Sequence, residues 1–584
     1  MPPPRHARAS IGPGVASLQK LNPISARVHW VRPRIPSHQE SELLTADCHP
    51  ITVVPRLHRL FLDFCSGAAA ARVFHASVSW DEGWRERPSV PAHWPELVRL
   101  LAEQNASPSP AAAAAIEALR NGAGAVVTGQ QVGLFGGPLF TPFKAATALA
   151  RARQATAAGR PHAAIFWLAS EDHDFAEINH VVFPARRELR TLRYSAAPET
   201  PRPVGGIVLD GSITPLLDEA WELLGASDAM EALAAAYQPG RTFAQAFTEF
   251  YSRVFAAPGL LILDPGGREF HRMGAPVLRA ALERADELHC ALIERNRELE
   301  AAGYHAQVAV MPQSSLLFLI DEHTGARMAL KRTASSAQEP DGLWQTERHS
   351  FSTAELLGIL DSEPERISPS ALLRPVFQDF LLSTSAIVGG PAEIAYFSQS
   401  AVLYERILGP KERGRITPAL PRFSATLIEP AIADLLRQHG LTLKRLFAES
   451  PATLAQSLAA QAMPNEEKQK LADAGSALEA GLTPLLDWMR SLDAGLGRSA
   501  ETAASKMRYQ MNRLRRLAAN FQLQREAQLS RHAEAVSQAL YPHGVLQERL
   551  HGAAYYFARY GFGLAEEITA QAANSCPGHT AIWL

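Results

Sequence analysis

This chain of 584 residues has few cysteines, a small net charge and no long apolar run. The four cysteines, Cys48, Cys65, Cys290 and Cys576, include no C-x-x-C pair, which argues against a zinc site or a disulfide framework and suits a reducing cytosol. The net charge of −2 gives no reason to expect nucleic acid or an anionic membrane as a partner. No apolar run approaches the roughly 20 residues that a membrane-spanning helix needs. We therefore expect a cytoplasmic protein with no membrane partner, no nucleic-acid partner and no structural metal.

Acidic residues are missing from the first 39 residues, which contain several Arg and many Pro. This segment also lacks the apolar core of a secretory signal. Acid-poor, Arg-containing leaders are typical of organelle transit peptides, but amphipathic periodicity is weak here. We interpret residues 1–50 as a disordered arm or an over-called translation start, with a transit peptide as the alternative.

The length of the chain exceeds what one hydrophobic core can hold and predicts two to four domains. Apolar residues at helical spacing predict a first helix from Leu57 to Phe64, and residues 111–120 predict another. Residues 122–168 then predict a strand, a loop, a helix and a second strand. Such a parallel crossover is nearly always right-handed and covers one face of a sheet.

A glycine-rich loop, Thr-Gly-Gln-Gln-Val-Gly-Leu-Phe-Gly-Gly-Pro at residues 128–138, joins the first of these strands to the helix. Thr141 is the predicted cap of that helix, with Pro142 in its first turn. The second strand, residues 163–168, ends in Ser-Glu-Asp-His-Asp at residues 170–174. Ligands bind outside the carboxyl ends of strands in open α/β sheets, so we predict the chemistry at this edge.

The rest of the chain divides into an α/β part and a helical part. The α/β part begins with a predicted strand at 259–263 and one long helix at 270–302. An antiparallel hairpin of 315–320 with 327–331, a helix at 372–380 and an apolar strand at 386–388 follow. A Gly-Gly-Pro turn and a helix through Tyr404 follow that strand. Residues 429–539 are helical in pattern and carry a heptad seam made of Met507, Met511, Leu514, Ala518 and Phe521.

Five blocks stand in order along the chain: residues 128–138, residues 171–180, Leu373-Arg374-Pro375 with Gln378-Asp379, residues 389–394, and Leu546-Gln547-Glu548-Arg549. Together they resemble the BshC family, described as cysteine ligases of bacillithiol biosynthesis. The resemblance runs from about residue 54 to the C-terminus. It implies an α/β fold with a Rossmann-like, nucleotidyltransferase-type core, a connecting insertion and a long helical coiled-coil domain.

The same resemblance implies domain boundaries and partners. Residues 54–425 would form the catalytic core with its insertion around 186–370, residues 429–539 a dimerising coiled coil, and residues 540–584 a tail that packs on the core. The implied reaction is a ligation that joins L-cysteine to glucosaminyl-malate through an amide bond, the last step of bacillithiol synthesis. A second copy of the chain is the implied protein partner.

The glycine-rich loop fits neither the Walker A pattern nor the G-x-G-x-x-G fingerprint. It could still bind an anion, because free amides and a helix N-terminus attract negative charge. The helix dipole opposes Lys144 in the following first turn by roughly 0.3–1 kcal/mol, so this lysine indicates an anionic ligand. A tight turn with a solvated lysine is the alternative. The predicted nucleotide contacts in this loop are Thr128, Gly129, Gln130, Gln131, Gly136 and Gly137.

Three acids and an imidazole follow the buried strand that ends at residue 168, which favours a pocket mouth over a solvated turn. Consecutive acids repel one another, so a bound cation or a raised pKa in one member is expected. One group would then deprotonate the amine, or Asp172 and Asp174 would hold Mg²⁺. A transition metal at His173 and His180 is less favoured, since no thiolate or H-E-x-x-H spacing accompanies them. The predicted catalytic residues are Asp172, His173, Asp174 and Lys144, with Glu171 and His180 as binding residues.

Two later blocks add binding candidates. Arg374, Gln378 and Asp379 share a helical face, where ligand binding and a salt-bridge role are about equally supported. Glu393 sits in the first turn after the Gly-Gly-Pro turn, where the helix dipole favours a carboxylate, and it could also hold a substrate ammonium group. We interpret residues 547–549 as structural. The predicted binding residues of these blocks are Arg374, Gln378, Asp379, Gly389, Gly390 and Glu393.

Activation of the carboxyl group is required, because carboxylates and amines do not condense readily in water. An acyl-adenylate formed from ATP with Mg²⁺ suits a nucleotidyltransferase-like core. The alternatives are a nucleotidyltransferase-like enzyme on another small acid, and a nucleotide-binding coiled-coil scaffold without catalysis. An excess of Arg at residues 506–531 is interpreted as a solvated coiled-coil face rather than an RNA site.

Overall fold

The computed structural model of the chain describes residues 44–75, 90–186, 188–333, 343–347, 349–409, 416–574 and 576–584. Most of the predicted leader, residues 1–43, lies outside this part of the chain. Its end does not: β1 (Ala46–His49) is a strand that pairs with the C-terminal strand β15 (His579–Trp583). The interpretation of residues 1–50 as a disordered arm is therefore wrong for these four residues.

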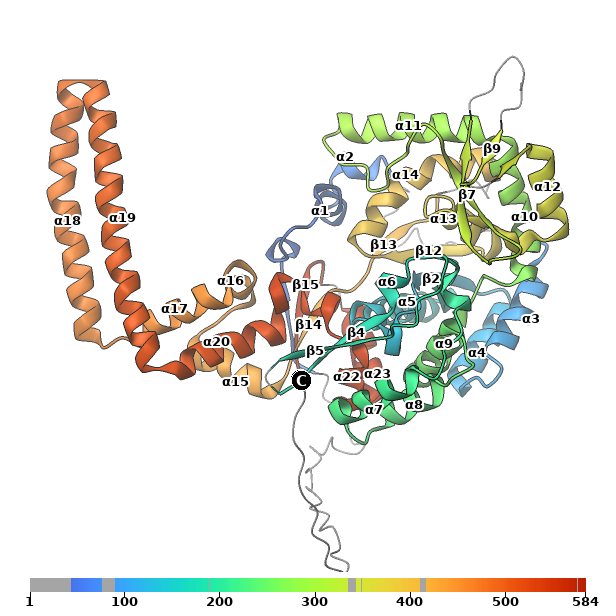
Figure 1. Cartoon of the computed structure of the whole chain (residues 1–584), viewed down its shortest axis with the longest axis horizontal. Helices are drawn as coiled ribbons and strands as arrows, with labels where there is room; N and C mark the ends of the chain where they lie inside the picture. Colours follow the sequence, from blue (N-terminus) through green and yellow to red (C-terminus); the bar gives the residue numbers. More distant parts are fainter. Residues whose placement is uncertain are drawn as a thin grey trace, which may run out of the picture. The chain divides into compact units, whose positions relative to one another are not determined.

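A parallel sheet of five strands forms the centre of the α/β part of the chain (Figure 1). The prediction of strand, loop, helix and strand for residues 122–168 is confirmed, because the two strands pair in parallel along their whole length. The strand on each side of this pair, residues 384–389 next to the first strand and residues 261–263 next to the second, also runs parallel to it. The strand order is β13 (Ala419–Pro421), β12 (Thr384–Gly389), β2 (Gly124–Gln130), β3 (His162–Leu168) and β6 (Leu261–Leu263).

Alternate residues of β2 and β3 enter two separate cores. Val126 and Phe166 belong to the core on one face, with helices α5 (Phe140–Ala157), α9 (Phe243–Val254), α22 (Ala553–Tyr560) and α23 (Gly563–Ala573). Val127 and Ile165 belong to the core on the other face, with helices α4 (Pro110–Arg120), α10 (Arg268–Glu283), α13 (Arg374–Leu381) and α14 (Pro391–Leu408). Successive side chains of a strand point to opposite faces, so a sheet covered twice needs continuous apolar strands.

The insertion is built on a second, antiparallel sheet. The predicted hairpin is confirmed as β7 (Ser314–Ile320) and β8 (Arg327–Arg332). The other strands of this sheet are β9 (Trp344–Gln345), β10 (Ser350–Phe351) and β11 (Ile367–Pro369), and α12 (Thr353–Ser362) packs on α10.

The single long helix predicted at residues 270–302 is wrong, because the structure has two helices there. Helix α10 ends before Arg284, whose φ of −113° and ψ of 26° are not helical, and α11 (Ala285–Ala301) begins after it. Asp286 and Glu287 stand in the first turn of α11, where carboxylates are stabilised by the helix dipole. Arg284 pairs with Glu287 at 2.6 Å, which holds the break together.

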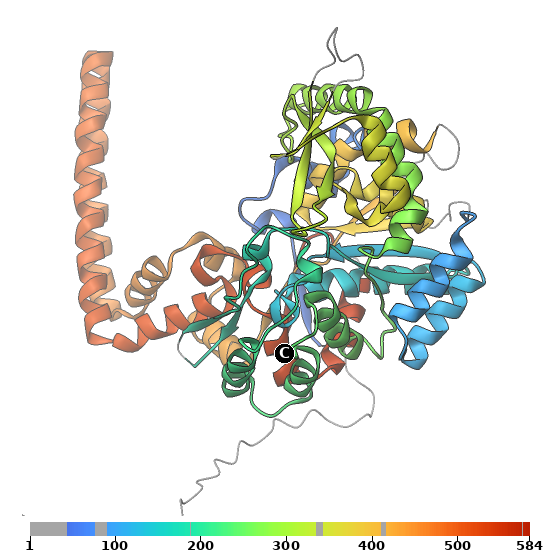
Figure 2. The same ribbon diagram turned by 45° about the vertical axis from the view of Figure 1, so that its right-hand side comes forward.

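The helical prediction for residues 429–539 is confirmed. Helices α18 and α19 run side by side as an antiparallel pair (Figures 1 and 2) and enclose a small core of Leu482, Leu486 and Ala504. Asp493 caps α19 by accepting hydrogen bonds from the amides of Gly495 and Leu496. The helices are α15 (Pro430–His439), α16 (Leu443–Ala448), α17 (Pro451–Ala462), α18 (Asn465–Leu492), α19 (Ala494–Arg525) and α20 (Ala527–Leu540).

The C-terminal residues return to the α/β core. Helix α23 packs against α5, and β15 lies between β1 and β14 (Ala425–Ile428) in a sheet of three strands. The other elements are α1 (Arg59–Ser66), α2 (Ala69–Arg72), α3 (Trp94–Gln104), α6 (Phe175–Ile178), β4 (His180–Pro184), β5 (Leu189–Arg193), α7 (Ile213–Leu224), α8 (Asp228–Ala236) and α21 (Gln547–Leu550). Among all these described helices, none is both long enough and apolar enough to span a membrane.

The expectation of no disulfide is wrong. Cys48 in β1 and Cys576, just before β15, form a disulfide with 5.7 Å between their Cα atoms. The spacing of the cysteines along the sequence could not reveal this bond, because it depends on the pairing of strands from the two ends of the chain.

Candidate active site

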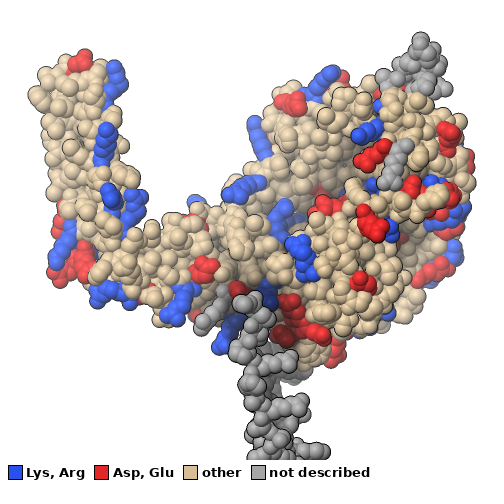
Figure 3. All heavy atoms as spheres, viewed as in Figure 1, with Lys and Arg blue, Asp and Glu red and all other residues tan. Residues whose placement is uncertain are grey.

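A cavity of about 250 Å³ lies at the carboxyl ends of β2, β3 and β12. Charges of both signs occur on the face of the protein shown in Figure 3, interspersed rather than gathered into one field. The cavity collects residues from predicted blocks that are far apart in the sequence. The predicted site residues that line it are Gly129, Gln130, Gln131, Lys144, Asp172, Arg374, Gln378, Gly390 and Glu393.

Lys144 on α5 is buried, with 3% of its side chain exposed, and is ion-paired. Its Nζ lies 2.5 Å from Glu393 Oε2 and donates to Gly129 O and to Gln130 Oε1, each at 2.8 Å. A lysine ammonium has three donors, so all three are engaged within the protein. Burial lowers the pKa of Lys144, although the charge of Glu393 opposes this shift. A phosphate could bind Lys144 only by displacing one of these acceptors.

The two glycines at the end of the loop have packing roles. Gly136 donates its N–H to Tyr237 Oη at 3.0 Å and accepts a hydrogen bond from Tyr251 Oη at 2.7 Å. Its φ of +85° favours glycine, and a Cβ there would lie 2.6 Å from the Phe250 ring. Gly137 is buried beside it. Neither glycine lines the cavity, so their predicted nucleotide contacts gain no support from the geometry.

Two other predicted positions, Thr128 and Gly389, make hydrogen bonds within the protein that link neighbouring segments, and the predicted cap Thr141 has another position in its helix. Thr128 donates from its hydroxyl to Val388 O at 3.1 Å, which ties β2 to β12. Gly389 accepts a backbone hydrogen bond from Arg422 N at 2.9 Å. Thr141 does not cap α5 as predicted, because that helix begins one residue earlier, at Phe140.

Asp172 is an ionised hydrogen-bond acceptor in the cavity wall. It accepts from Gln131 Nε2 at 2.5 Å and from the backbone N–H of His173 at 2.8 Å. Burial alone would raise the pKa of Asp172, but these two hydrogen bonds and the charges of Arg327 and Arg374 bring it below its ordinary value. A carboxylate held in this way is a weak base.

His173 receives a hydrogen bond from an arginine of the insertion. Arg327 on β8 donates from Nη1 to His173 Nδ1 at 3.0 Å, so Nδ1 is an acceptor and the neutral ring carries its proton on Nε2. Burial and the charge of Arg327 lower the pKa of His173. Arg327 is itself fixed by hydrogen bonds to Ser368 Oγ and Pro369 O, and it lies 3.7 Å above the Phe318 ring. Sequence reasoning missed Arg327, because nothing local marks an arginine in a hairpin of the insertion.

The end of the acidic motif contains a further candidate, Glu177, which lines the cavity. Glu177 is an exposed residue by its accessible surface. Partial desolvation of its carboxyl group, assisted by the charges of Asp172 and Asp174 and opposed by a hydrogen bond from Gln131, raises its pKa. Asp174 itself is exposed and caps α6 by accepting from Glu177 N at 3.1 Å. His180 does not line the cavity, and its Nδ1 lies 3.2 Å from Ala176 O.

The geometry gives no support to Mg²⁺ held by Asp172 and Asp174. One oxygen of Asp174 caps a helix, and both oxygens of Asp172 accept hydrogen bonds from the protein. No group of three His, Cys, Asp or Glu side chains that could hold a metal ion occurs within the ranges that the structure describes.

Glu171, predicted as a binding residue, pairs with a buried histidine instead. Its Oε1 lies 3.0 Å from Nε2 of His271 on α10, and Nδ1 of the same ring lies 3.0 Å from Ile367 O. Burial alone would lower the pKa of His271, but the charge and hydrogen bond of Glu171 raise it. The pair fixes the end of β3 to α10 and to β11.

Some of the predicted residues on α13 line the cavity and one does not. Arg374 lines the cavity and donates from Nη2 to Tyr396 Oη at 2.8 Å. Gln378 lines it as well, but Asp379 does not; it accepts hydrogen bonds from Tyr404 Oη on α14 and from Gln378 Nε2. The prediction that Asp379 binds a ligand therefore gives way to a role in joining two helices.

Two further arginines line the cavity, and sequence reasoning assigned neither to it. Arg422 donates from both terminal nitrogens to the buried carboxylate of Glu548, at 3.1 and 2.5 Å, which confirms the structural interpretation of Glu548. Burial would raise the pKa of Glu548, but the charge and hydrogen bonds of Arg422 lower it. The side chain of Arg549 has no hydrogen bond or ion pair within the described part of the chain, so its structural interpretation gains no support from side-chain contacts.

Residues 47–408 match the family model described as the N-terminal Rossmann-like domain of BshC in bacillithiol biosynthesis, and residues 425–584 match the model of its C-terminal coiled-coil domain. The chain belongs to the BshC family. Relatives named "Putative cysteine ligase BshC" include that of Koribacter versatilis (strain Ellin345), 41% identical over 92% of this chain and 99% of the relative. The corresponding protein of Solibacter usitatus (strain Ellin6076) is 35% identical over 78% of this chain and 83% of its own length. A third, from Salinibacter ruber (strain DSM 13855 / M31), is 31% identical over 87% of this chain and 93% of its own. The predicted family and fold are confirmed, and the names support the prediction of a ligase.

Proposed function

We propose that this BshC-family chain joins the carboxyl group of L-cysteine to the amine of glucosaminyl-malate and so completes bacillithiol. The observation that carries the proposal is a cavity, in a chain of this family, that has arginines and carboxyl groups in one wall. Glucosaminyl-malate needs both, since it brings two carboxylates and one amine. The identity of both substrates comes from the family resemblance.

Arg549 is the residue that we assign to a carboxylate of the malate unit. Arg422 is already paired with Glu548, and Arg374 donates to Tyr396. Arg549 lines the same cavity with its donors uncommitted in the described structure. Guanidinium groups bind carboxylates through two parallel hydrogen bonds, so an uncommitted arginine suits a dicarboxylate ligand.

Glu177 is the residue that we assign as general base. The amine of the substrate must lose a proton before or during its attack, and the best base has a pKa near the working pH. The raised pKa of Glu177 meets this requirement better than the lowered pKa of Asp172. His173 is also less suited, because its Nδ1 lone pair already accepts from Arg327.

Activation of the cysteine carboxyl by ATP with Mg²⁺, through an acyl-adenylate, stays our prediction for the cosubstrate. The residues predicted to cradle its phosphates do not fit that role as they stand, because Lys144 is ion-paired and Gly136 is hydrogen-bonded to two tyrosines. We therefore derive no step through the nucleotide. The chain's own contribution is to bind the dicarboxylate and to take the proton.

The coiled coil supports a homodimer. The predicted seam does not pack against α18 within the chain: Leu514 and Phe521 are 56% and 62% exposed. Helix α18 has its own exposed apolar positions, among them Trp488 at 55% and Leu492 at 57%. Apolar stripes at heptad spacing are stabilised by burial against another helix, so we assign this surface to a second copy of the chain.

The test is to incubate the purified protein with cysteine and glucosaminyl-malate, with and without ATP and Mg²⁺, and to follow bacillithiol by mass spectrometry. Glu177→Gln should lower kcat by about 10²–10⁴-fold with little change in KM. Arg549→Gln should raise KM for glucosaminyl-malate by roughly 10–100-fold, since a hydrogen bond to a charged group contributes about 1.5–3 kcal/mol. Glu188→Gln, at an exposed glutamate that pairs with Arg190, is the matched control.

The outcomes separate the candidate functions. Product that requires ATP and is accompanied by AMP supports an adenylating ligase. Nucleotide binding without product under any of these conditions would refute the ligase and favour the nucleotide-binding scaffold. Full turnover by Glu177→Gln would remove Glu177 as the base.

A further inference from the structure

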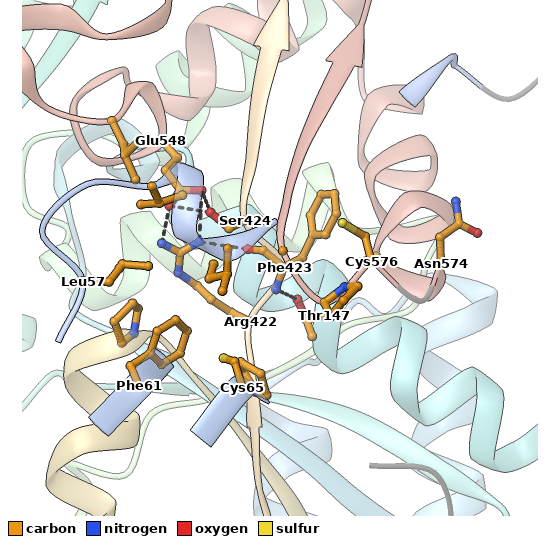
Figure 4. A pocket seen from close by; sticks show the side chains of 18 of the residues that line it. Leu57, Phe61, Cys65, Thr147, Arg422, Phe423, Ser424, Glu548, Asn574 and Cys576 are labelled. Atoms are coloured by element: carbon orange, nitrogen blue, oxygen red, sulfur yellow. Dashed lines mark hydrogen bonds and ion pairs between the residues drawn. The ribbon is translucent and has the colours of Figure 1, made fainter. Parts of the chain in front are cut away.

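The disulfide Cys48–Cys576 stands at the border between water and a cavity of about 50 Å³. Cys48 on β1 is exposed, whereas Cys576 is half-buried and lines the cavity. Figure 4 shows Cys576 among the lining side chains, beside Phe423, with Arg422, Ser424 and Glu548 on the other side of that ring in this view. The bond thus joins an exposed residue to a half-buried residue that lines a cavity.

Three arginines, Arg151, Arg422 and Arg549, line the same small cavity as Cys576. Arg422 is paired with Glu548, while the side chain of Arg549, an exposed residue, has no hydrogen bond or ion pair within the residues described. Positive charge stabilises a thiolate relative to the thiol, and a stabilised thiolate is a better leaving group.

We propose that Cys48–Cys576 is a site of thiol–disulfide exchange with low-molecular-weight thiols, in which Cys48 is modified and Cys576 is released. The incoming thiol gives its proton to water, and its thiolate attacks Cys48 Sγ. A new sulfur–sulfur bond forms between the two, and the Cys48–Cys576 bond breaks. The bonding electron pair leaves with Cys576 as a thiolate that lines the same cavity as the arginines, so the step needs no oxidant.

The fold makes the exchange reversible. Strand β1 remains paired with β15 through backbone hydrogen bonds, with Cys48 opposite Thr580, so the two cysteines stay close after the bond opens. The Cys576 thiolate can then attack the mixed disulfide and expel the small thiol. Cys65 also lines the cavity, but burial raises the pKa of its thiol to about 12, which keeps it protonated and unreactive.

The exchange changes the charge next to the candidate active site. Pro391, Arg422 and Arg549 line both the small cavity and the larger one. A thiolate at Cys576 therefore adds a negative charge to a cavity that is also lined by Arg549, the residue assigned above to a substrate carboxylate. The chemistry itself requires no ligase activity, so it stands or falls independently of the proposed function.

The test uses the full chain, purified without reductant and treated with reduced cysteine in oxygen-free buffer. Samples are quenched with acid and N-ethylmaleimide over a time course and mapped by peptide mass spectrometry. We expect one cysteinyl group on Cys48 and one maleimide on Cys576. Only reduced thiol is added, so a free cysteine such as Cys290 can gain a cysteinyl group only from the cystine that a second thiol releases from the mixed disulfide. That modification should therefore follow the adduct on Cys48 and stay below it, and Cys65→Ser should behave as the wild type.

Three results would overturn the proposal. They are a disulfide that stays intact at every cysteine concentration, a cysteinyl group on Cys576 with maleimide on Cys48, and alkylation of both cysteines with no mixed disulfide at any time. Arg549→Gln should slow the formation of the adduct several-fold. Arg437→Gln, which removes an exposed arginine of α15, should leave the rate unchanged. Equal rates of adduct formation in the two variants would show that Arg549 does not stabilise the Cys576 thiolate.

Discussion

The ion pair between Lys144 and Glu393 allows a test of what the lysine does. Glu393→Gln keeps the shape of the side chain but removes the charge that faces Lys144 Nζ at 2.5 Å. The lysine then remains buried with only the neutral acceptors Gly129 O and Gln130 Oε1. If the pair mainly stabilises the fold, this variant should open α5 and the end of β2 more easily than the wild type does.

The magnitude follows from the burial of the lysine. Removing one partner of a buried pair usually destabilises a protein by about 3–5 kcal/mol, because the other charge is left without compensation. Adding Lys144→Met removes that charge, so the double variant should be less destabilised than the sum of the single changes by roughly 0.5–3 kcal/mol. The control is an exposed pair between α5 and α23, Arg153 with Glu566, and Glu566→Gln should change stability by less than about 1 kcal/mol.

Hydrogen exchange of peptides from α5 is the suitable assay, because it reports local opening in a protein too large for a two-state analysis. Equal exchange in Glu393→Gln and Glu566→Gln, or strict additivity in the double variant, would refute the structural role. Turnover and nucleotide affinity of Lys144→Met are measured alongside. If both are unchanged in a folded protein, the predicted contact between Lys144 and phosphate is wrong.

Two further predictions concern stability and assembly. Glu548→Gln should lower the free energy of local opening around β14 and α21 at pH 7 by about 3–5 kcal/mol, because Arg422 stays buried without its carboxylate. The folded pKa of Glu548 is lowered, so its contribution is present above the unfolded value of about 4.3 and is lost as the pH falls through the folded pKa. Hydrogen exchange of peptides from β14 and α21 should show the two proteins converging in acid, and a constant gap would contradict this. Leu514→Lys in the exposed apolar stripe should convert a dimer to a monomer in light scattering. Asn512→Lys, two residues earlier on α19 and outside the predicted seam, should leave the dimer intact. A dimer that persists in Leu514→Lys would show that this stripe is not the dimer interface.

The central sheet was predictable because its signals are local. Residues 125–127 and 163–168 are continuously apolar, as strands covered on both faces must be, and glycine or charged residues mark where each strand ends. The carboxyl edge followed from topology alone, since parallel neighbours end on the same side. Gln131 and Asp172, which were predicted at this edge, line the cavity, and Arg374, which was predicted from the family resemblance, lines it with them.

The remaining parts depend on contacts between distant segments. Arg327 reaches His173 from a hairpin in the insertion, and no local pattern distinguishes it from a surface arginine. The disulfide depends on β1 and β15, which meet only in the folded chain. The break at Arg284 also escaped prediction, because helical periodicity continues across it and only the packing of α10 and α11 on different neighbours separates them.

Lys144 shows how a correct physical rule led to an incomplete conclusion. A cation near a helix N-terminus does require a nearby anion, and the structure supplies one from within the chain as Glu393. The same neutralisation removes Arg422, through Glu548, and Glu171, through His271, from the charges open to a ligand. The cavity wall still contains Arg374 and Asp172, which are hydrogen-bonded to the neutral side chains of Tyr396 and Gln131. It also contains Arg549, whose side chain has no partner among the described residues, and Glu177, a carboxyl group with a raised pKa. Arg549 and Glu177 are the least committed of these groups. These two groups match a carboxylate and an amine on one substrate, and this is why the proposed chemistry rests on them rather than on the residues with the strongest sequence signals.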